Sequence, residues 1–245
     1  MKKFFSKIAQ WMRRYDESHN FTCDICGREV FANERVCAAC RAQLPFNGGH
    51  VCPLCGRKVL EAGVCIECKD SRPVVEKARS CFVHEGSAAA LVLQFKKGKR
   101  YLVRALNGFL LPVLEAQFPD ADALAFVPMT KRARRRRGYN QARLLAGELS
   151  RSSGVPLLDA AEKRRETAAQ KALGRREREK NLEGCFRVTD RSAVRGKRIV
   201  IVDDTFTTGA TVNELARVFY RAGARSVCAL TVTSVPCKIC KTANA

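Results

Sequence analysis

The sequence predicts an α/β domain with a doubly wound, mostly parallel sheet, preceded by a small Cys-rich module. Three observations predict this fold class. Residues 199–202 read Ile-Val-Ile-Val, and an uninterrupted run of β-branched residues suits a strand that is buried on both faces of a parallel sheet. Strand-like and helix-like patterns alternate between residues 79 and 236, as successive strand–helix units require. Finally, eight Cys form four C-x-x-C pairs between residues 21 and 70.

The length and the net charge of the chain limit its domain organisation and the partners that it favours. A chain of 245 residues accommodates one α/β domain of ~150 residues and a smaller module. We expect a basic amphipathic helix at 1–20, a double zinc ribbon at 21–70, the α/β domain at 79–236 and a tail at 237–245. The formal net charge of +21 favours polyanionic partners such as nucleic acid, an anionic membrane surface or phosphate-rich ligands.

The four Cys pairs have the spacing of structural zinc sites. Two neighbouring pairs supply four thiolates to one tetrahedral ion and leave no open coordination position. Pairing in sequence gives two zinc ions, while interleaved pairing or a single occupied site remains an alternative. Four tandem pairs are not typical of a redox protein, in which a single C-x-x-C lies in a βαβ unit. The expected ligands are Cys23, Cys26, Cys37, Cys40, Cys52, Cys55, Cys65 and Cys68.

The two ends of the chain carry weaker signals. The apolar residues of 1–20 have helical spacing among Lys and Arg, which predicts a helix that packs on its own domain or contacts a membrane or partner. This segment lacks the continuous apolar core of a signal peptide, and no apolar run reaches the ~18 residues that span a bilayer. We therefore expect a cytoplasmic protein. Cys237 and Cys240 form a further C-x-x-C without a partner pair, and we treat it as accessory.

Within the α/β domain, each element is expected from its pattern. Apolar runs predict strands, and 3.6-residue periodicity predicts helices. Residues 162–183 are polar and highly charged, which is typical of a mobile surface loop. The expected strands are 81–83, 123–127, a strand beginning at 157–158, 184–188, 199–202 and 227–235. The expected helices are 88–95, 102–114 (despite Pro112), 141–150 and 212–222.

A strongly basic segment follows the strand at 123–127. Six of the seven residues 131–137 are Lys or Arg. A charge run is usually a solvated surface, and here it would form a loop. The carboxyl ends of parallel strands face one ligand crevice, however, so this loop would lie opposite Asp203 and Asp204. It could neutralise pyrophosphate, bind nucleic-acid phosphates, or do both.

The stretch from Asp203 to Thr211 carries the most specific chemistry. The two carboxylates follow the strand at 199–202, and the turn after them reads Thr207, Thr208, Gly209, Ala210 and Thr211. Backbone N–H groups of such a turn, at a helix start, converge on an anion. Adjacent carboxylates would repel bare phosphate, so they fit sugar hydroxyls or a metal. A phosphate beside a diol describes ribose 5-phosphate.

Two other interpretations of this stretch are weaker. A hydrophobic strand that ends in two Asp is also typical of a Walker B element. The chain contains no G-x-x-x-x-G-K-[ST] motif, which such a site requires. The remaining alternative is an ordinary strand–turn–helix corner with an acidic cap.

Together these motifs resemble the ComF/ComFC (GntX-like) family of phosphoribosyltransferase-like competence proteins. The segments that carry the resemblance are the four Cys pairs, FKKGKR at 95–100, VPMTKRARRRRGYNQ at 127–141, QKALGRREREKNLEGCFRV at 170–188 and VIVDDTFTTGAT at 200–211. The resemblance implies a type I phosphoribosyltransferase fold that binds phosphoribosyl pyrophosphate (PRPP) with Mg²⁺. It implies that Asp203 and Asp204 hold the ribose hydroxyls, and that residues 207–211 hold the 5′-phosphate.

The resemblance also implies which residues face the pyrophosphate. Residues 127–129 would form the pyrophosphate loop, and residues 162–183 would form the flexible loop over PRPP. The residues expected to bind pyrophosphate or DNA phosphates are Val127, Pro128, Met129, Lys131, Arg134, Arg137, Asn140, Gln141, Lys171, Arg175 and Arg178. The family implies DNA uptake in natural transformation, with single-stranded DNA and a helicase as partners. The alternative is a genuine phosphoribosyltransferase of nucleotide or salvage metabolism without a DNA role.

Overall fold

The computed structural model describes residues 22–31, 34–166 and 181–237. The expected N-terminal helix, the residues Lys171, Arg175 and Arg178, and Cys240 lie outside the described residues. The chain divides into two compact units, Met1–Leu44 and Pro45–Ala245. The first two Cys pairs belong to the smaller unit, and the last two belong to the larger one.

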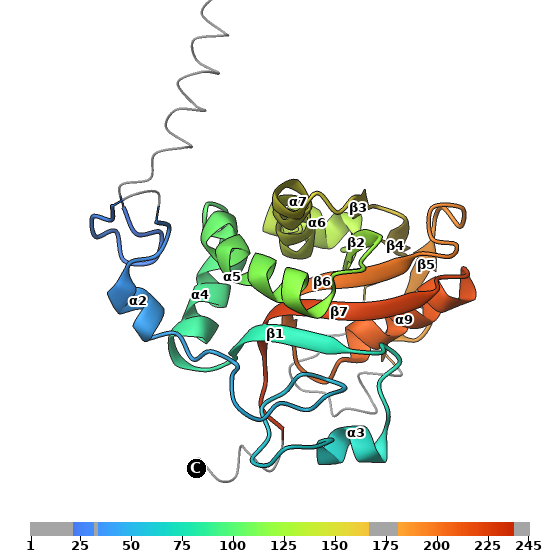
Figure 1. Ribbon diagram of the computed structural model, residues 1–245. Helices are drawn as coiled ribbons and strands as arrows, with labels where there is room; N and C mark the ends of the chain where they lie inside the picture. The colour runs from blue at the N-terminus through green and yellow to red at the C-terminus, as the bar shows by residue number, and fades with distance from the viewer. Residues whose placement is uncertain (1–21, 32–33, 167–180, 238–245) are drawn as a thin grey trace, which may run out of the picture. The chain divides into compact units, whose positions relative to one another are not determined.

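The larger unit is built on a five-stranded sheet in which every neighbouring pair is parallel (Figure 1). Its strand order is β1-β7-β6-β2-β3. The prediction of a doubly wound, mostly parallel sheet is confirmed, with β6 at its centre. The strands are β1 (Ala78–Val83), β2 (Ala123–Phe126), β3 (Leu157–Leu158), β6 (Arg198–Phe206) and β7 (Ser226–Ser234).

Helices connect the strands and cover both faces of the sheet, as parallel crossovers require. Helix α5 continues through Pro112, as expected, and packs beside α7. Helix α9 follows β6 directly and packs against β7. The helices of the unit are α3 (Ile66–Asp70), α4 (Gly86–Lys96), α5 (Leu102–Gln117), α6 (Lys131–Arg137), α7 (Gln141–Ser153) and α9 (Ala210–Arg221).

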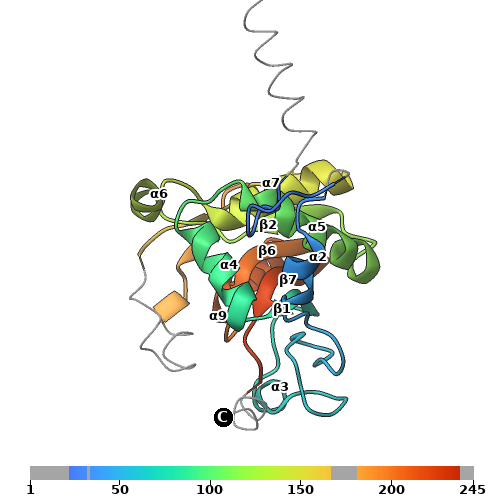
Figure 2. The same ribbon diagram turned by 90° about the vertical axis from the view of Figure 1, so that its left-hand side faces the viewer.

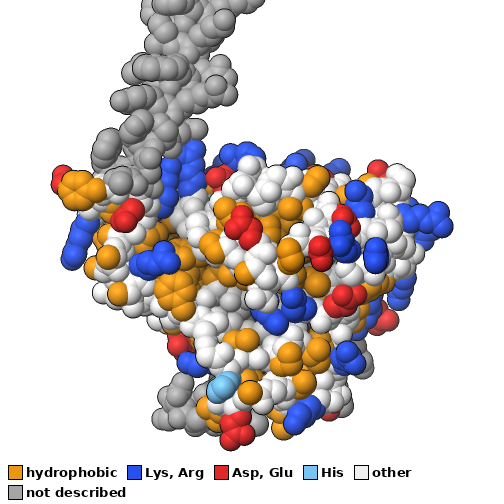
Figure 3. Space-filling model, in the orientation of Figure 1, with side chains coloured by type: hydrophobic (Ala, Val, Ile, Leu, Met, Phe, Trp, Pro, Cys, Tyr) orange, Lys and Arg blue, Asp and Glu red, His pale blue; other side chains and the backbone are white. Residues whose placement is uncertain are grey.

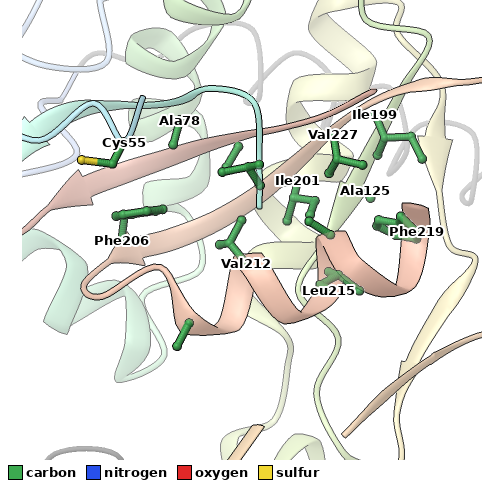
Figure 4. Close-up of a cluster of buried hydrophobic side chains, with 14 of the residues drawn as sticks. Cys55, Ala78, Ala125, Ile199, Ile201, Phe206, Val212, Leu215, Phe219 and Val227 are labelled. Atoms are coloured by element: carbon green, nitrogen blue, oxygen red, sulfur yellow. The ribbon is translucent and has the colours of Figure 1, made fainter. Parts of the chain in front are cut away.

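Alternate residues of β6 point to opposite faces of the sheet. Ile199 and Ile201 pack with Val212, Leu215 and Phe219 of α9 in one buried cluster (Figure 4). Both faces of the strand are buried, which explains the continuous apolar run in its sequence. The run therefore identified a central strand correctly.

Most expected elements differ from the structure by a few residues at their ends, and three differences affect the site. Strand β6 does not end at Val202 but continues to Phe206, because it pairs with β7 beyond the point where β2 stops. The basic segment 131–137 is not a loop but helix α6. Residues 162 and 163, expected in the loop 162–183, belong to strand β4 (Ala161–Lys163), which pairs antiparallel with β5 (Phe186–Val188).

Helix α6 forms because its flanking residues and its composition favour a helix. The Thr130 hydroxyl accepts a hydrogen bond from the Ala133 N–H at 3.1 Å and caps the N-terminus. Arg is also a good helix former. A charge run that looked like a loop is therefore a short helix at the carboxyl end of β2.

The second ribbon is part of the larger unit's core. All four of its Cys are buried, and Cys55 packs in the same cluster as Ala78 and Phe206 (Figure 4). The segment from Pro45 onward also runs along β1. The Val83 N–H donates to the Pro45 carbonyl, the Asn47 N–H donates to the Cys81 carbonyl and the Ala78 N–H donates to the Leu54 carbonyl, each at 2.8 Å.

Within the described ranges, none of the helices combines the length and the apolar character needed to cross a bilayer. On the face seen in Figure 3, basic and acidic side chains are interspersed with apolar ones. The basic excess of the sequence is therefore not a uniform field on that face.

Candidate functional site

The eight ribbon Cys form two four-thiol clusters, with pairing in sequence. One cluster contains Cys23, Cys26, Cys37 and Cys40, and the other contains Cys52, Cys55, Cys65 and Cys68. The sulfurs of Cys26 and Cys37 lie 3.8 Å apart, and those of Cys55 and Cys65 lie 3.6 Å apart. Four sulfurs at ~2.3 Å from a tetrahedral zinc are separated by about 3.8 Å. Both clusters therefore fit a structural zinc ion, and interleaved pairing is excluded.

In each cluster, backbone N–H groups favour the thiolate form of one Cys, whereas burial and neighbouring thiols raise the pKa of Cys40, Cys55 and Cys65. The Cys37 N–H donates to the Cys23 sulfur and the Cys65 N–H donates to the Cys52 sulfur, both at 3.4 Å. Burial of the Cys52 thiol opposes its ionisation, but N–H groups of Cys55, Cys65 and Leu54 outweigh it and lower its pKa to about 7. Similar donors lower the pKa of Cys23 to about 7. Thiolates are the form that zinc binds.

The two carboxylates of β6 lie at the carboxyl end of the sheet and have different surroundings. Asp204 is buried and forms an ion pair with Lys96, the last residue of α4, at 2.5 Å. Asp203 forms no such pair in the described residues. Burial of the Asp203 carboxyl, together with the charge of Asp204, raises its pKa to about 7. Asp204 thus has a cationic partner, whereas the raised pKa of Asp203 lets that carboxyl gain and lose a proton near neutrality.

A small polar network extends from this ion pair to β1. Lys96 also lies 3.5 Å from the Thr205 hydroxyl, which is 3.3 Å from the Thr233 hydroxyl. The ring of His84 reaches the Thr233 hydroxyl at 2.9 Å. Burial and the nearby ammonium of Lys96 lower the pKa of His84, which favours its neutral form.

The turn at 207–211 follows β6 and leads into α9. Gly209 is the residue before the helix and has a φ of +79°. A Cβ there would lie 2.6 Å from Cζ of Phe206, so no larger residue fits without displacing the ring. The Thr208 hydroxyl accepts a hydrogen bond from the Ala210 N–H at 3.3 Å. The turn is therefore tight and leads directly into the start of a helix.

A pocket of about 330 Å³ opens beside the carboxylates. Its lining residues come from the segment after β2, from α6 and α7, which Figure 2 shows beside β2, and from β4 and β6. Of the predicted residues, those that line it are Val127, Pro128, Met129, Arg137, Asn140, Gln141, Asp203 and Asp204. Lys131 and Arg134 of α6 are exposed outside its lining. None of the turn residues 207–211 is among the lining residues; Thr207 is exposed, and the others are half-buried or buried.

Two of the lining residues also organise the site. The Asn140 amide donates to the Val127 carbonyl at 3.0 Å, and its oxygen accepts from the Arg143 N–H at 3.2 Å. Asn140 thus joins the end of β2 to the start of α7. The Gln141 oxygen accepts from Arg137 at 3.2 Å, whereas its buried Nε2 has no hydrogen-bond partner among the described residues.

Two distant motifs meet next to this pocket. The Arg100 guanidinium donates to the Gly138 carbonyl at 3.1 Å and lies 4.6 Å from the centre of the Tyr139 ring. The Tyr139 hydroxyl donates to the Phe95 carbonyl. These contacts join the 95–100 segment to the 137–141 segment and hold Lys96 near Asp204.

Sequence reasoning missed several residues of the site. The ion-pair partner of Asp204 lies within FKKGKR at 95–100, so the only available signal was a Lys at the end of a helical pattern. Thr130 donates to Glu166, and both line the pocket, but no local pattern pairs residues so far apart in the chain. Ala133 and Ala142 also line the pocket without having been named. Arg136 and Lys163 line it too, and they belong to the segments 131–137 and 162–183 that were expected to face the ligand.

Comparison with known proteins gives the same two-part organisation. A family model described as "Phosphoribosyl transferase domain" matches residues 136–241, and one described as "Double zinc ribbon domain" matches residues 20–69. These matches confirm the predicted phosphoribosyltransferase fold with an N-terminal zinc-ribbon region.

Curated relatives match most of the chain. Competence protein ComFC of Bacillus subtilis is 30% identical, covering 86% of this chain and 90% of the relative. DNA utilization protein YhgH of Escherichia coli K12 is 33% identical, covering 84% and 86%. Competence protein F of Haemophilus influenzae is 29% identical, covering 85% and 94%.

Proposed function

Because this chain belongs to the family of ComFC and YhgH, we propose that it is a PRPP-binding protein of DNA uptake that handles single-stranded DNA. The observation that supports this ligand is the pair Asp203 and Asp204 near the end of β6, with the 207–211 turn directly after the strand. A DNA-uptake helicase is the protein partner that we propose with it, in the cytoplasm.

In this proposal, different elements of the site hold different parts of the ligand. The 207–211 turn would hold the 5′-phosphate, and Asp203 would accept hydrogen bonds from the ribose hydroxyls. Arg137 and Arg136 line the pocket on the side of α6, where their charge would stabilise pyrophosphate. Mg²⁺ bound to the ligand would offset the remaining pyrophosphate charge. Lys171, Arg175 and Arg178, in the part of the chain between β4 and β5, are proposed to contribute as well.

One observation favours a transfer reaction in addition to binding. Besides the carboxylates, Glu166 and Gln141 line the pocket, and the buried Nε2 of Gln141 has no hydrogen-bond partner among the described residues. A polar acceptor next to the ribose could hydrogen-bond with both groups. A phosphoribosyltransferase of nucleotide or salvage metabolism therefore stays the second candidate.

PRPP binding is tested by thermal unfolding. With Mg²⁺ and PRPP at about 100 times Kd, the wild type gains ~2.7 kcal/mol, which should raise Tm by roughly 5 °C or more in a unit of this size. The double variant Asp203→Asn/Asp204→Asn should show no such rise, whereas Glu115→Gln, an exposed carboxyl on α5, should behave as the wild type. If Mg²⁺ and PRPP do not raise the Tm of the wild type, the proposal is wrong.

DNA binding is proposed for the exposed face of α6, where Lys131, Arg132, Arg134 and Arg135 are all exposed. Replacing Arg134 and Arg135 with Ala should weaken binding of single-stranded DNA at low salt. It should also reduce the slope of log K against log salt by up to ~1.4, since each single-strand phosphate contact contributes ~0.7. Fluorescence anisotropy at several salt concentrations measures both quantities.

A charge-matched control separates α6 from the general basic excess. Arg191→Ala/Arg221→Ala removes two exposed arginines at other places in the chain. If this variant flattens the slope as much as the α6 variant does, α6 is not the DNA-binding surface.

A further inference from the structure

We propose that Arg57 is a positioning residue through which the second zinc cluster fixes the 207–211 turn. The inference rests on the proposed function of that turn as a phosphate site. It assigns to the second ribbon a role in the ligand site that zinc binding alone does not require.

Arg57 is held by both Cys pairs of the second cluster. Its carbonyl accepts a hydrogen bond from the Cys52 N–H at 2.9 Å. Its guanidinium donates to Glu67, which lies between Cys65 and Cys68, at 3.2 Å. Both side chains of this ion pair are buried, at 8% and 9% exposure. The place of the guanidinium therefore depends on the closed cluster that brings the two pairs together.

The same guanidinium lies against the last residue of β6. Its carbon is 5.5 Å from the centre of the Phe206 ring. Phe206 is 3% exposed and packs in the same cluster as the second ribbon's four Cys. A desolvated cation over an aromatic ring is attracted to the ring face. Arg57 thus restricts where this ring can lie.

The Phe206 ring also supports the 207–211 turn, at Gly209. Three carbons of its ring lie within 3.2 Å of the position that a Gly209 Cβ would take. Gly209 is the residue from which α9 starts, so the ring sets how closely the turn approaches β6. A continuous chain of contacts therefore runs from the second zinc cluster through Arg57 and Phe206 to Gly209.

The first ribbon shows that zinc binding does not require these contacts. Its Cys23–Cys26 pair is also followed by Gly and Arg, and the Cys23 N–H donates to the Arg28 carbonyl at 2.7 Å. Arg28 is nevertheless exposed. The residue that corresponds to Glu67 by its place between two Cys is Ala39. The buried ion pair is therefore an addition specific to the second ribbon.

The glycine that precedes each of these arginines also has different surroundings in the two ribbons. A Cβ added to Gly56 would lie 2.3 Å from the Ala78 carbonyl oxygen on β1, whereas one on Gly27 would meet nothing within 4 Å. The second ribbon is therefore pressed onto the sheet at the residue next to Arg57. This close approach fixes Arg57 relative to β6.

Hydrogen exchange in the full chain tests the inference, with peptide 203–213 as the reporter. Arg57→Ala should increase exchange at the turn amides by about tenfold or more, as a local opening does. Exchange over residues 215–221 and the zinc content should not change. Arg28→Ala, its counterpart in the first ribbon, should exchange as the wild type. Binding of Mg²⁺–PRPP should weaken by about tenfold in Arg57→Ala but not in Arg28→Ala.

A second variant covers the case in which Arg57→Ala loses zinc or fails to fold. Phe206→Leu keeps an apolar side chain but removes the ring, and it should loosen the turn in the same way. If folded, zinc-loaded Arg57→Ala and Phe206→Leu both exchange at the wild-type rate, or if Arg28→Ala has the same effect, the inference is wrong. The exchange measurement needs no ligand, so a failure of PRPP to bind would be recognised separately.

Discussion

Replacing Cys55 with Ser should remove one of two zinc ions and lower the Tm of the larger unit by about 10 °C or more. The reason is the place of the second cluster in the core. Cys55 is 3% exposed and packs with Ala78 and Phe206, so three thiols left without a cation would be buried beneath the sheet. Elemental analysis and calorimetry of the same samples measure both effects.

The matched variant is Cys26→Ser in the first ribbon. It should also lose one zinc ion, because it breaks an equivalent cluster. Cys26 is exposed and belongs to the separate unit Met1–Leu44, so the main transition should move by no more than about 2 °C, as for an independent site. Equal losses of Tm in the two variants would contradict this difference between the ribbons.

The stability of the larger unit should fall as pH rises through neutrality, and Asp203 should be the cause. The pKa of Asp203 is raised from 3.8 to about 7 by burial and by the charge of Asp204. A raised carboxyl pKa stabilises the folded state below the unfolded pKa, and this contribution is lost as pH rises through the folded pKa. Between pH 5 and pH 8 the loss should be about 2–3 kcal/mol.

Asp203→Asn should remove this pH dependence while keeping the side-chain shape. The Asp204 N–H donates to the Asp203 oxygen at 2.8 Å, and an Asn oxygen can accept the same bond. Urea unfolding at several pH values measures the difference between this variant and the wild type, with Glu115→Gln as the control. A wild type whose pH profile matches that of Asp203→Asn would show that Asp203 does not titrate in this range.

Local patterns predicted the sheet and most helices because the burial of an element determines which of its residues are apolar. The run at 199–202 reflects a strand with both faces covered, and the Cys spacing reflects a coordination geometry. Helix α6 was missed for a physical reason. Its seven residues carry no apolar stripe, so only the Thr130 cap and the high helix propensity of Arg distinguish it from a loop.

The candidate site could be predicted only where its residues are close in sequence. Asp203, Asp204 and the turn after them lie within one motif. Lys96 reaches Asp204 across more than one hundred residues, and Arg57 reaches Phe206 across about one hundred and fifty. Whether such residues meet depends on how the strands and the second ribbon pack. No periodic pattern in the sequence predicts that packing.

The contacts between the second ribbon and β1 have a consequence for association between copies of the chain. Strand β1 is at the edge of the sheet, and an uncovered edge strand offers free N–H and C=O groups to another molecule. The segment that begins at Pro45 occupies part of this edge through three backbone hydrogen bonds. At the opposite edge, β3 has only two residues, too few to template a partner strand. Chelation of the second zinc would thus uncover a strand edge, and aggregation would follow the loss of the metal.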